Sequence, residues 1–242
     1  MIKTSTINDA TANANCIFDN IPKKTKAKVL TYGTEITAQK GNIIFFEGDS
    51  PDHLYFIKEG KIRLTKLSED GKVFFLQTKK SQDLLGELNL FNGFTHRFDA
   101  EVVQDCKLLR FDRKEIENLL AKDTDLAACL LKILSIENQT LLHQFRDLIF
   151  CGKQGAVFAM LIRLSNEYGK KISTGILINR KVTNQELANF VGATRESINR
   201  ILKRLIRQKI ISVNTKYITI HDIDFLKEHL RCAHCPFEEC TI

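Results

Sequence analysis

The spacing of the apolar residues changes once along this 242-residue chain, near Arg113, and that change constrains the fold more than any other feature. Residues 33 to 111 form short runs rich in β-branched and aromatic residues, separated by glycines, which predicts strands and turns. From residue 113 onward, apolar residues recur every three or four positions, which predicts helices. The sequence therefore predicts an α+β protein, and its length suggests two domains.

The first part of the chain has the strand pattern of a β-sandwich or jelly roll. Glu59-Gly60 and Asp70-Gly71 are predicted as turns between paired strands, because glycine accepts the positive φ that such turns need. We expect a short helix around Pro22–Tyr32 and a β domain over residues 16–112. The predicted strands are Asn42–Glu47, Leu54–Lys58, Lys61–Lys66, Val73–Gln77 and Lys107–Phe111.

A long helix is predicted after a short one that begins at Arg113. The helical pattern runs from about Asp123 to Cys151, some 29 residues, which corresponds to about 43 Å at 1.5 Å per residue. No second predicted helix has a matching length, so we expect this helix to pair with its copy in a homodimer. A helix bundle within one chain is the alternative. Residues 113–152 are therefore assigned to a dimerisation helix region.

The positive charge is concentrated in one block. The chain carries 36 basic and 29 acidic residues, a net charge of +7. Residues 170–231 hold 13 Lys and Arg against 5 Asp and Glu, which leaves 23 against 24 elsewhere. A localised basic excess is typical of a protein that binds a polyanion, and we expect nucleic acid before an anionic membrane.

The remaining composition predicts a cytoplasmic protein without a membrane span. No apolar run approaches the roughly 20 residues that cross a bilayer, and the first fifteen residues lack the apolar core of a signal peptide. Seven cysteines, an odd number, indicate reduced thiols or metal ligands rather than a disulfide framework.

A helix-turn-helix is predicted within residues 153–230. Thr183 and Glu186 have the spacing of a capping box at a helix start, Gly192 ends that helix, and Thr194 can cap a second one. A β hairpin is expected at Ile210–Ile220, with its turn at Asn214-Thr215. Together these elements predict a winged helix-turn-helix domain.

The polar face of the second helix carries side chains suited to a major groove. These are Arg195, Glu196, Asn199, Arg200 and Lys203. Arginine can bond both acceptors of guanine, glutamate can accept from cytosine, and asparagine suits adenine. An ordinary solvated helix face is the alternative, but the turn spacing, the charge block and the hairpin agree on DNA binding.

Two motifs resemble those of the family of the cyclic-AMP receptor protein and the fumarate/nitrate reduction regulator (CRP/FNR). Residues 86–91 (GELNLF) are similar to its sensor-domain motif, and residues 194–200 (TRESINR) to the core of its recognition helix. The resemblance covers about residues 16–230. It implies a cyclic-nucleotide-binding-like jelly roll, a long dimerisation helix, a winged helix-turn-helix, a palindromic TGTGA-like DNA site and RNA polymerase as a partner. It also assigns base reading to Arg195, Glu196 and Arg200, whereas Asn199 departs from the glycine or serine of relatives.

The resemblance also bears on the effector. Cyclic-nucleotide binders of the family hold the phosphate with an Arg-Ser or Arg-Thr pair, together with a glutamate that accepts from the ribose. The corresponding residues here are Glu87, Arg97 and Phe98. Because Phe98 removes a hydroxyl donor and fills space, we do not expect a cyclic nucleotide as effector. Glu87 and Arg97 are expected to pair with each other or with backbone.

A cysteine cluster occupies the C-terminal tail, residues 231–242. Cys232, Cys235 and Cys240 lie within nine residues, a density suited to one soft centre, an iron–sulfur cluster or zinc. A thiol–disulfide switch is a further alternative. Cys106 and Cys129 are expected to be buried as small apolar residues.

The tail resembles that of the bacillus type of FNR, which implies a four-iron four-sulfur (4Fe-4S) cluster bound by these three cysteines and one aspartate. The matching aspartate is Asp147, late in the predicted long helix, and Cys151 and His234 are alternative fourth ligands.

The main functional hypothesis is an oxygen-responsive regulator of anaerobic genes. The alternative is a CRP-like regulator that senses a small molecule in its β domain, with structural zinc or a thiol switch at the tail. An enzyme is not expected, because no Ser-His-Asp grouping or phosphate loop is visible.

Overall fold

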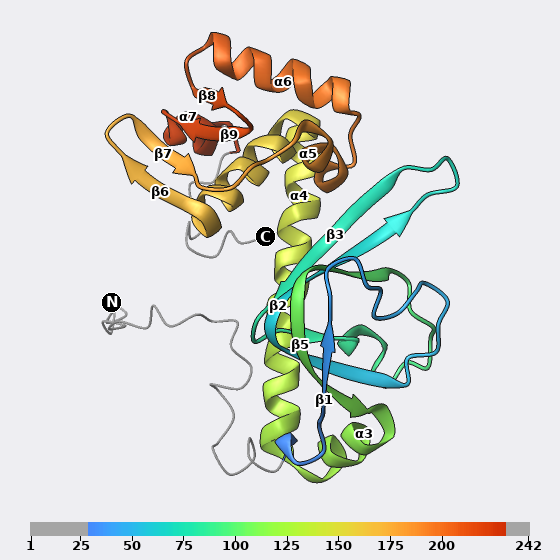
Figure 1. Cartoon of the computed structure of the whole chain (residues 1–242). Coiled ribbons are helices and arrows are strands. Elements are labelled where there is room, and N and C mark those ends of the chain that lie inside the picture. The colour runs from blue at the N-terminus through green and yellow to red at the C-terminus, as the bar shows by residue number, and fades with distance from the viewer. Residues whose placement is uncertain (1–28, 231–242) are drawn as a thin grey trace, which may run out of the picture.

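The computed structural model describes residues 29–230, which form a β domain, a long helix and a C-terminal domain (Figure 1). The β domain contains β1 (Thr34–Ala38), β2 (His53–Leu67), β3 (Val73–Lys80), β4 (Leu84–Leu85) and β5 (Asp99–Asp112), with the 3-10 helix η1 (Glu87–Asn89) between β4 and β5. The sheet has the order β1-β5-β2-β3, β4 pairs with β2, and every pairing is antiparallel. The predicted β-rich domain is thus confirmed.

Strand β2 corrects the prediction of two strands joined by a turn at Glu59-Gly60. It runs without interruption from His53 to Leu67, because the long strand β5 pairs with both halves of it. Gly60 has a φ of 98° and lies where the register with β5 shifts, so it forms a bulge instead of a turn. The turn predicted at Asp70-Gly71 is confirmed, since it joins β2 to β3.

The predicted strand Asn42–Glu47 is wrong. Only Ile43 forms a bridge, to Glu101, and the regular edge strand is β1. Two carboxylates divert the backbone: the Phe46 amide donates to Asp49 at 2.8 Å, and the Glu47 amide donates to Asp99 at 2.7 Å. The backbone of Asn42, Ile44 and Phe45 still bonds to β5, but from Phe46 onward these side-chain acceptors replace the partners that a strand would supply.

The predicted short and long helices are present as α3 (Arg113–Lys122) and α4 (Thr124–Tyr168). Gly152, with φ 60° and ψ −166°, interrupts α4 at the point where the long helix was expected to end, and the segment beyond it belongs to the C-terminal domain. One side of α4 packs on the β domain through Leu126 and Leu130. The predicted helix around Pro22–Tyr32 lies mostly outside the described residues.

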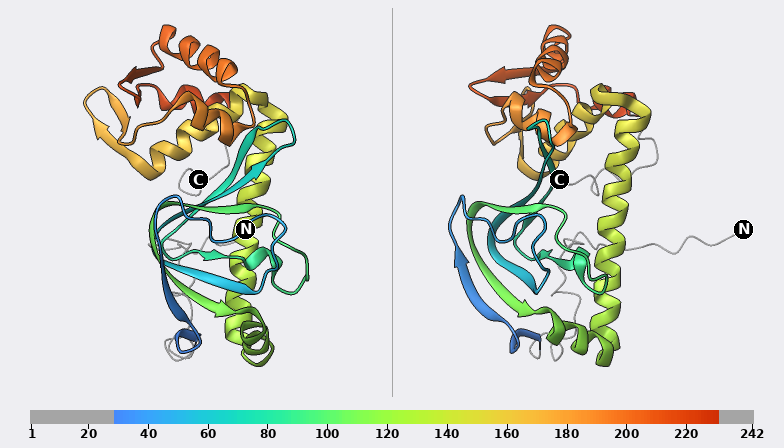
Figure 2. Two further views of the ribbon diagram at one scale, coloured as in Figure 1. Left: turned by 45° about the vertical axis from the view of Figure 1, so that its right-hand side comes forward. Right: turned by 90° about the vertical axis from the view of Figure 1, so that its right-hand side faces the viewer.

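Along the flank of the molecule (Figure 2), α4 carries exposed apolar residues, three of which, Leu142, Phe145 and Leu148, line a cavity together with Phe75 of β3. The exposed residues of α4 include Leu131, Leu142, Phe145, Leu148, Ile149 and Phe150, the last of them 81% exposed. An apolar helix face of this length is suited to pairing with a second copy. Among the described residues, α4 alone has the length and apolarity to cross a membrane, but 56% of that stretch is buried inside the protein, as in a core helix.

The C-terminal domain packs three further helices on a four-stranded sheet of order β6-β7-β9-β8. Its elements after α4 are β6 (Gly169–Ile172), β7 (Gly175–Ile178), α5 (Asn184–Val191), α6 (Arg195–Arg207), β8 (Ile211–Asn214), β9 (Tyr217–Ile220) and α7 (Ile223–His229). The predicted hairpin is confirmed as β8–β9, but its turn lies one residue later than the predicted Asn214-Thr215. Asn214 pairs with Tyr217, so the turn residues are Thr215 and Lys216, both with positive φ. The hairpin β6–β7 was not predicted.

Candidate DNA-binding and sensor sites

The helix-turn-helix forms through local capping contacts. The Thr183 hydroxyl accepts from the Glu186 amide at 3.0 Å, and the Thr194 hydroxyl accepts from the Ser197 amide at 3.2 Å. Gly192 has the left-handed conformation, φ 67° and ψ 35°, that ends α5 and begins the turn. Both predicted helix starts and the glycine turn are therefore confirmed.

Helix α6 presents a polar face opposite its buried residues Ile198, Leu202 and Leu205. Arg195, Glu196, Arg200 and Lys203 are exposed on it. Further basic residues, Arg204 and Arg207, follow in the last turn. The arrangement leaves base-reading donors at the N-terminal end of α6 and positive charge toward its C-terminal end, as groove entry with phosphate contacts requires.

Asn199 differs from the other four residues predicted for DNA contact. It is half-buried, and its Oδ1 accepts from Asn184 Nδ2 at 3.5 Å, across the two helices of the motif. Its amide therefore has a packing role between α5 and α6 in addition to any contact with a base.

The β2–β3 hairpin extends toward the helix-turn-helix (Figure 1). Arg63 of β2 makes the contact between them. The Arg63 guanidinium lies 4.2 Å from the ring centre of Phe75 and 5.8 Å from that of Phe190 on α5, and its Nη2 is 3.6 Å from Glu186 Oε1. Burial lowers the pKa of Arg63. Glu186 is also bonded to Arg180, so its carboxylate does not complete the predicted capping box. Through its ion pair with Arg63 it joins the two domains instead. No pattern in the sequence indicates this contact.

The sensor-domain glutamate has a partner that the sequence did not suggest. The expected pairing of Glu87 with Arg97 is wrong: Glu87 bonds Lys79 of β3 at 2.9 Å, whereas Arg97 is exposed and lies over the ring of Phe94. Phe98 is half-buried and packs against the core, as its bulk predicted. The carboxylate that a ribose would need is thus already bonded to an internal cation.

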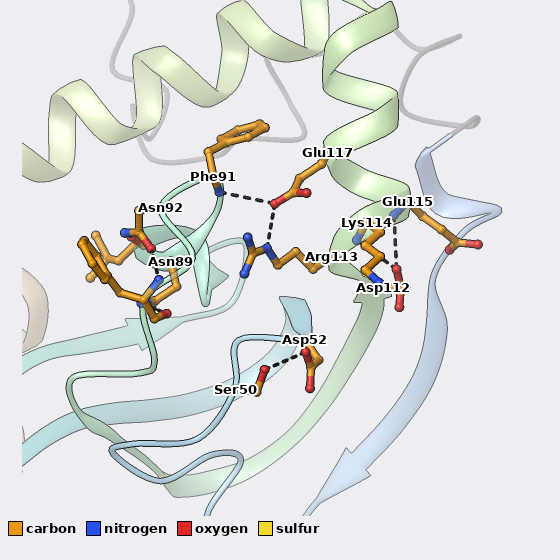
Figure 3. A network of polar contacts seen from close by, with 12 residues as sticks. Ser50, Asp52, Asn89, Phe91, Asn92, Asp112, Arg113, Lys114, Glu115 and Glu117 are labelled. Atoms are coloured by element: carbon orange, nitrogen blue, oxygen red, sulfur yellow. Dashed lines mark hydrogen bonds and ion pairs between the residues drawn. The ribbon is translucent and has the colours of Figure 1, made fainter.

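The loop after η1 is closed by its own polar contacts (Figure 3). The Asn89 amide donates to the carbonyls of Phe94 and Thr95, each at 3.0 Å. Glu117 of α3 accepts from the Phe91 amide at 3.4 Å and from Arg113 at 2.6 Å. Polar groups of the segment that corresponds to the family's phosphate-binding stretch are thus already hydrogen-bonded within the protein.

Asp147 lies buried on α4, only 3% exposed, and both of its oxygens are engaged. Oδ2 accepts from Arg163 at 2.6 Å, and Oδ1 accepts from Arg146 at 2.8 Å. The Arg163 side chain is 5% exposed, whereas that of Arg146 is 38% exposed. Asp147 and Arg163 line a cavity of about 380 Å³ whose other walls come from β3, α4 and α5.

The predicted cysteine ligands Cys232, Cys235 and Cys240, and the alternative ligand His234, lie outside the described residues. Within residues 29–230, no group of three His, Cys, Asp or Glu side chains could hold a metal ion. The expectation for Cys106 and Cys129 is confirmed, since Cys106 is buried and Cys129 packs against the apolar core, and burial raises the pKa of both thiols.

Cys151 lies one helical turn beyond Asp147 and is near Leu230, the last described residue, in space. A side-chain carbon on Gly155 would meet atoms of both Cys151 and Leu230, so Leu230 packs beside this turn of α4. Leu230 precedes the first tail cysteine by two residues.

Comparisons with known proteins agree with this architecture. Residues 35–123 match the cyclic nucleotide-binding domain, and residues 156–229 match the Crp-like helix-turn-helix domain. The chain is 37% identical over 211 residues to the anaerobic regulatory protein of Bacillus subtilis, covering 86% of this chain and 89% of that protein. It is 25% identical over 215 residues to a CRP-like cAMP-activated global transcriptional regulator of Mycobacterium tuberculosis, covering 89% and 96%.

Solved structures share the fold. A CooA mutant from Carboxydothermus hydrogenoformans superposes with a TM-score of 0.70 at 20% identity, covering 84% of this chain and 90% of that one. The c-di-GMP responsive global regulator CLP of Xanthomonas campestris gives 0.72 at 22% identity, covering 83% and 100%.

Proposed function

The chain belongs to the CRP/FNR family of transcription regulators, and we propose that it is an oxygen-responsive regulator of anaerobic genes, active as a cytoplasmic homodimer with a 4Fe-4S cluster. Its relatives are transcription regulators and not enzymes. The similarity to an anaerobic regulatory protein supports the physiological part of this proposal.

DNA recognition is assigned to the N-terminal half of α6. Arg195, Glu196 and Arg200 would contact base edges, and Lys203 would bind a phosphate. A dimer formed through the exposed face of α4 would set two such helices about 34 Å apart, the spacing of successive major grooves. We therefore expect a palindromic site of the TGTGA type, and RNA polymerase as the next partner.

The donor set fits an iron–sulfur cluster. Three thiolates within nine residues match the preference of such clusters for cysteine, and a carboxylate is a harder, more easily displaced fourth ligand. When bound, the cluster would supply reactivity toward oxygen. Cys232, Cys235, Cys240 and Asp147 are the residues proposed to hold it, with Cys151 and His234 as alternative fourth ligands.

Asp147 can take this role without leaving its buried position. Its Oδ1 is bonded to the partly exposed Arg146, which can exchange that bond for water. Its Oδ2 stays with the buried Arg163, which belongs to the C-terminal domain. One oxygen can therefore be released as a ligand while the other continues to fix the carboxylate.

The observation that carries the proposal is the position of Leu230. This residue packs beside Cys151, one turn of α4 from Asp147, and two further residues span at most about 7 Å to Cys232. The tail that carries the three cysteines therefore starts near the turn of α4 that follows Asp147.

The test is the metal content of protein purified without oxygen. We expect about four irons and four sulfides per chain, a brown colour that bleaches in air, and DNA affinity that falls with it. Cys232→Ala should lose the iron, whereas Cys129→Ala, a half-buried cysteine on the same helix as Asp147, should keep it. Zinc alone, or no metal, would contradict the proposal and favour a β-domain effector or a thiol switch.

A further inference from the structure

A buried lysine joins two carboxylates from separate elements of the β domain and the long helix. Lys79 of β3 is fully buried, with no exposed side-chain surface. Its Nζ lies 2.9 Å from Glu87 Oε1 on η1 and 2.5 Å from Glu137 Oε1 on α4. The Glu87 side chain is 1% exposed and that of Glu137 is 17% exposed.

The charges of this cluster do not cancel when all three groups are ionised. One ammonium then faces two carboxylates, so a net negative charge would be buried, which is unfavourable. Each carboxylate also has one oxygen, Glu87 Oε2 and Glu137 Oε2, that is buried without a hydrogen-bond partner. A proton on Glu137 would remove the net charge, and its O–H could donate to Glu87, so that both oxygens would gain a partner.

Nearby titratable groups do not supply that balance. Asp83, after β3, is half-buried and burial raises its pKa, and as an acid it cannot add a positive charge. The charge of Lys80 opposes the rise in the pKa of Asp83. His96 stacks on Phe45, and burial lowers its pKa. Burial and the charge of Glu87 raise the pKa of Glu137 to about 7, although Lys79 opposes this shift.

We propose that Glu87 and Glu137 share one proton above the Lys79 ammonium, and that this proton fastens the β domain to the long helix leading to the DNA-binding domain. Protonation comes from solvent and no other reactant is needed. Loss of the proton to water at higher pH leaves two buried carboxylates around one cation and weakens the contact between η1 and α4. DNA affinity is therefore expected to fall as the pH rises through neutrality.

Because the pKa of Glu137 is raised in the folded protein, the free energy of unfolding should fall as the pH rises. The folded protein holds a proton that the unfolded chain releases at a pH near 4.5, the ordinary value for this group. Between that value and about 7, the unfolding equilibrium constant should rise by up to about tenfold per pH unit on account of this group. Above about 7 the contribution is constant.

The experiment compares full-length wild type with Glu137→Gln, which replaces the protonated acid by a neutral group of the same shape. An infrared spectrum at about pH 6 should contain the carbonyl band of a protonated buried carboxyl group, absent in Glu137→Gln. The decline of the urea midpoint between pH 5 and 7 should be shallower in Glu137→Gln. Its affinity for a TGTGA-type duplex should no longer fall between pH 6 and 8, in contrast to that of the wild type.

Asp125→Asn is the matched control, because Asp125 is an exposed acid on the same helix. It should keep the wild-type infrared band and both pH profiles. A band that persists in Glu137→Gln, or an unchanged stability profile, would refute the shared proton. A flattened stability profile with an unchanged pH dependence of DNA binding would refute the link to DNA affinity.

Discussion

Replacing Asp147 by alanine should destabilise the protein even when no metal is bound. In the iron-free protein its carboxylate neutralises Arg163, whose side chain is only 5% exposed. Asp147→Ala would leave that guanidinium buried without its acceptor. The contact with Arg146 adds little, since that side chain is 38% exposed.

The expected loss follows from the burial of the pair. Removing one member of a buried ion pair typically costs about 3 to 5 kcal/mol, because the remaining charge is uncompensated. Removing both members lowers the free energy of unfolding much less, because no uncompensated charge is then left buried. We therefore expect Asp147→Ala combined with Arg163→Met to recover most of the stability that the single variant loses.

Urea unfolding of the iron-free protein at pH 7 and constant protomer concentration measures this effect. Constant concentration is needed because dimerisation contributes to apparent stability. A single variant that unfolds at the wild-type urea concentration would refute the role assigned to the Asp147–Arg163 pair. Iron content after anaerobic purification then reports separately on Asp147 as a cluster ligand.

Three further predictions concern other parts of the molecule. Gly60→Ala should lower the free energy of unfolding by about 2 to 5 kcal/mol, because the new Cβ would lie 2.3 Å from a carbonyl oxygen of β5. Its control is Gly71→Ala, which has open space around it and should lower the free energy of unfolding by only about 1 kcal/mol in the same urea titration. Arg195→Ala should weaken DNA binding by about 1 to 3 kcal/mol through the loss of discrimination at one base pair. Fluorescence anisotropy with altered DNA sites should show that discrimination at the other base pairs is unchanged. Arg63→Ala should lower the free energy of unfolding by about 1 to 2 kcal/mol and make amide hydrogen exchange in α5 faster. Unchanged exchange would contradict the role of Arg63 between the domains.

The helix-turn-helix could be predicted from the sequence because its determinants are local. Thr183 and Thr194 each cap a helix through an amide three residues ahead, and Gly192 supplies one left-handed residue. The end of the long helix was also local, since Gly152 alone breaks the helical geometry of α4. Contacts within a few residues leave their pattern in a single stretch of sequence.

The β strands were predicted less well because their limits depend on a distant partner. Gly60 resembles a turn in sequence, yet β2 continues through it because β5 pairs on both sides of it. Asn42–Glu47 has strand composition, but the side chains of Asp49 and Asp99 bind its amides. Only the second of those acids is far away in sequence, and its position could not be known without the fold.

The charged contacts between domains left the weakest signal. Lysine is among the residues least often buried, and the partners of Lys79 lie 8 and 58 residues away on other elements. Alternation along β3 gives no local sign either, because the register with β2 shifts between Phe75 and Gln77, which sets Phe75 opposite Thr65 and Lys79 opposite the buried Ile62. A fully buried lysine needs a buried acid as its partner, and the shared proton proposed above would balance the second acid. The pairing of Lys79 with Glu87 and Glu137 therefore becomes visible only once η1 and α4 are known to cover that part of β3.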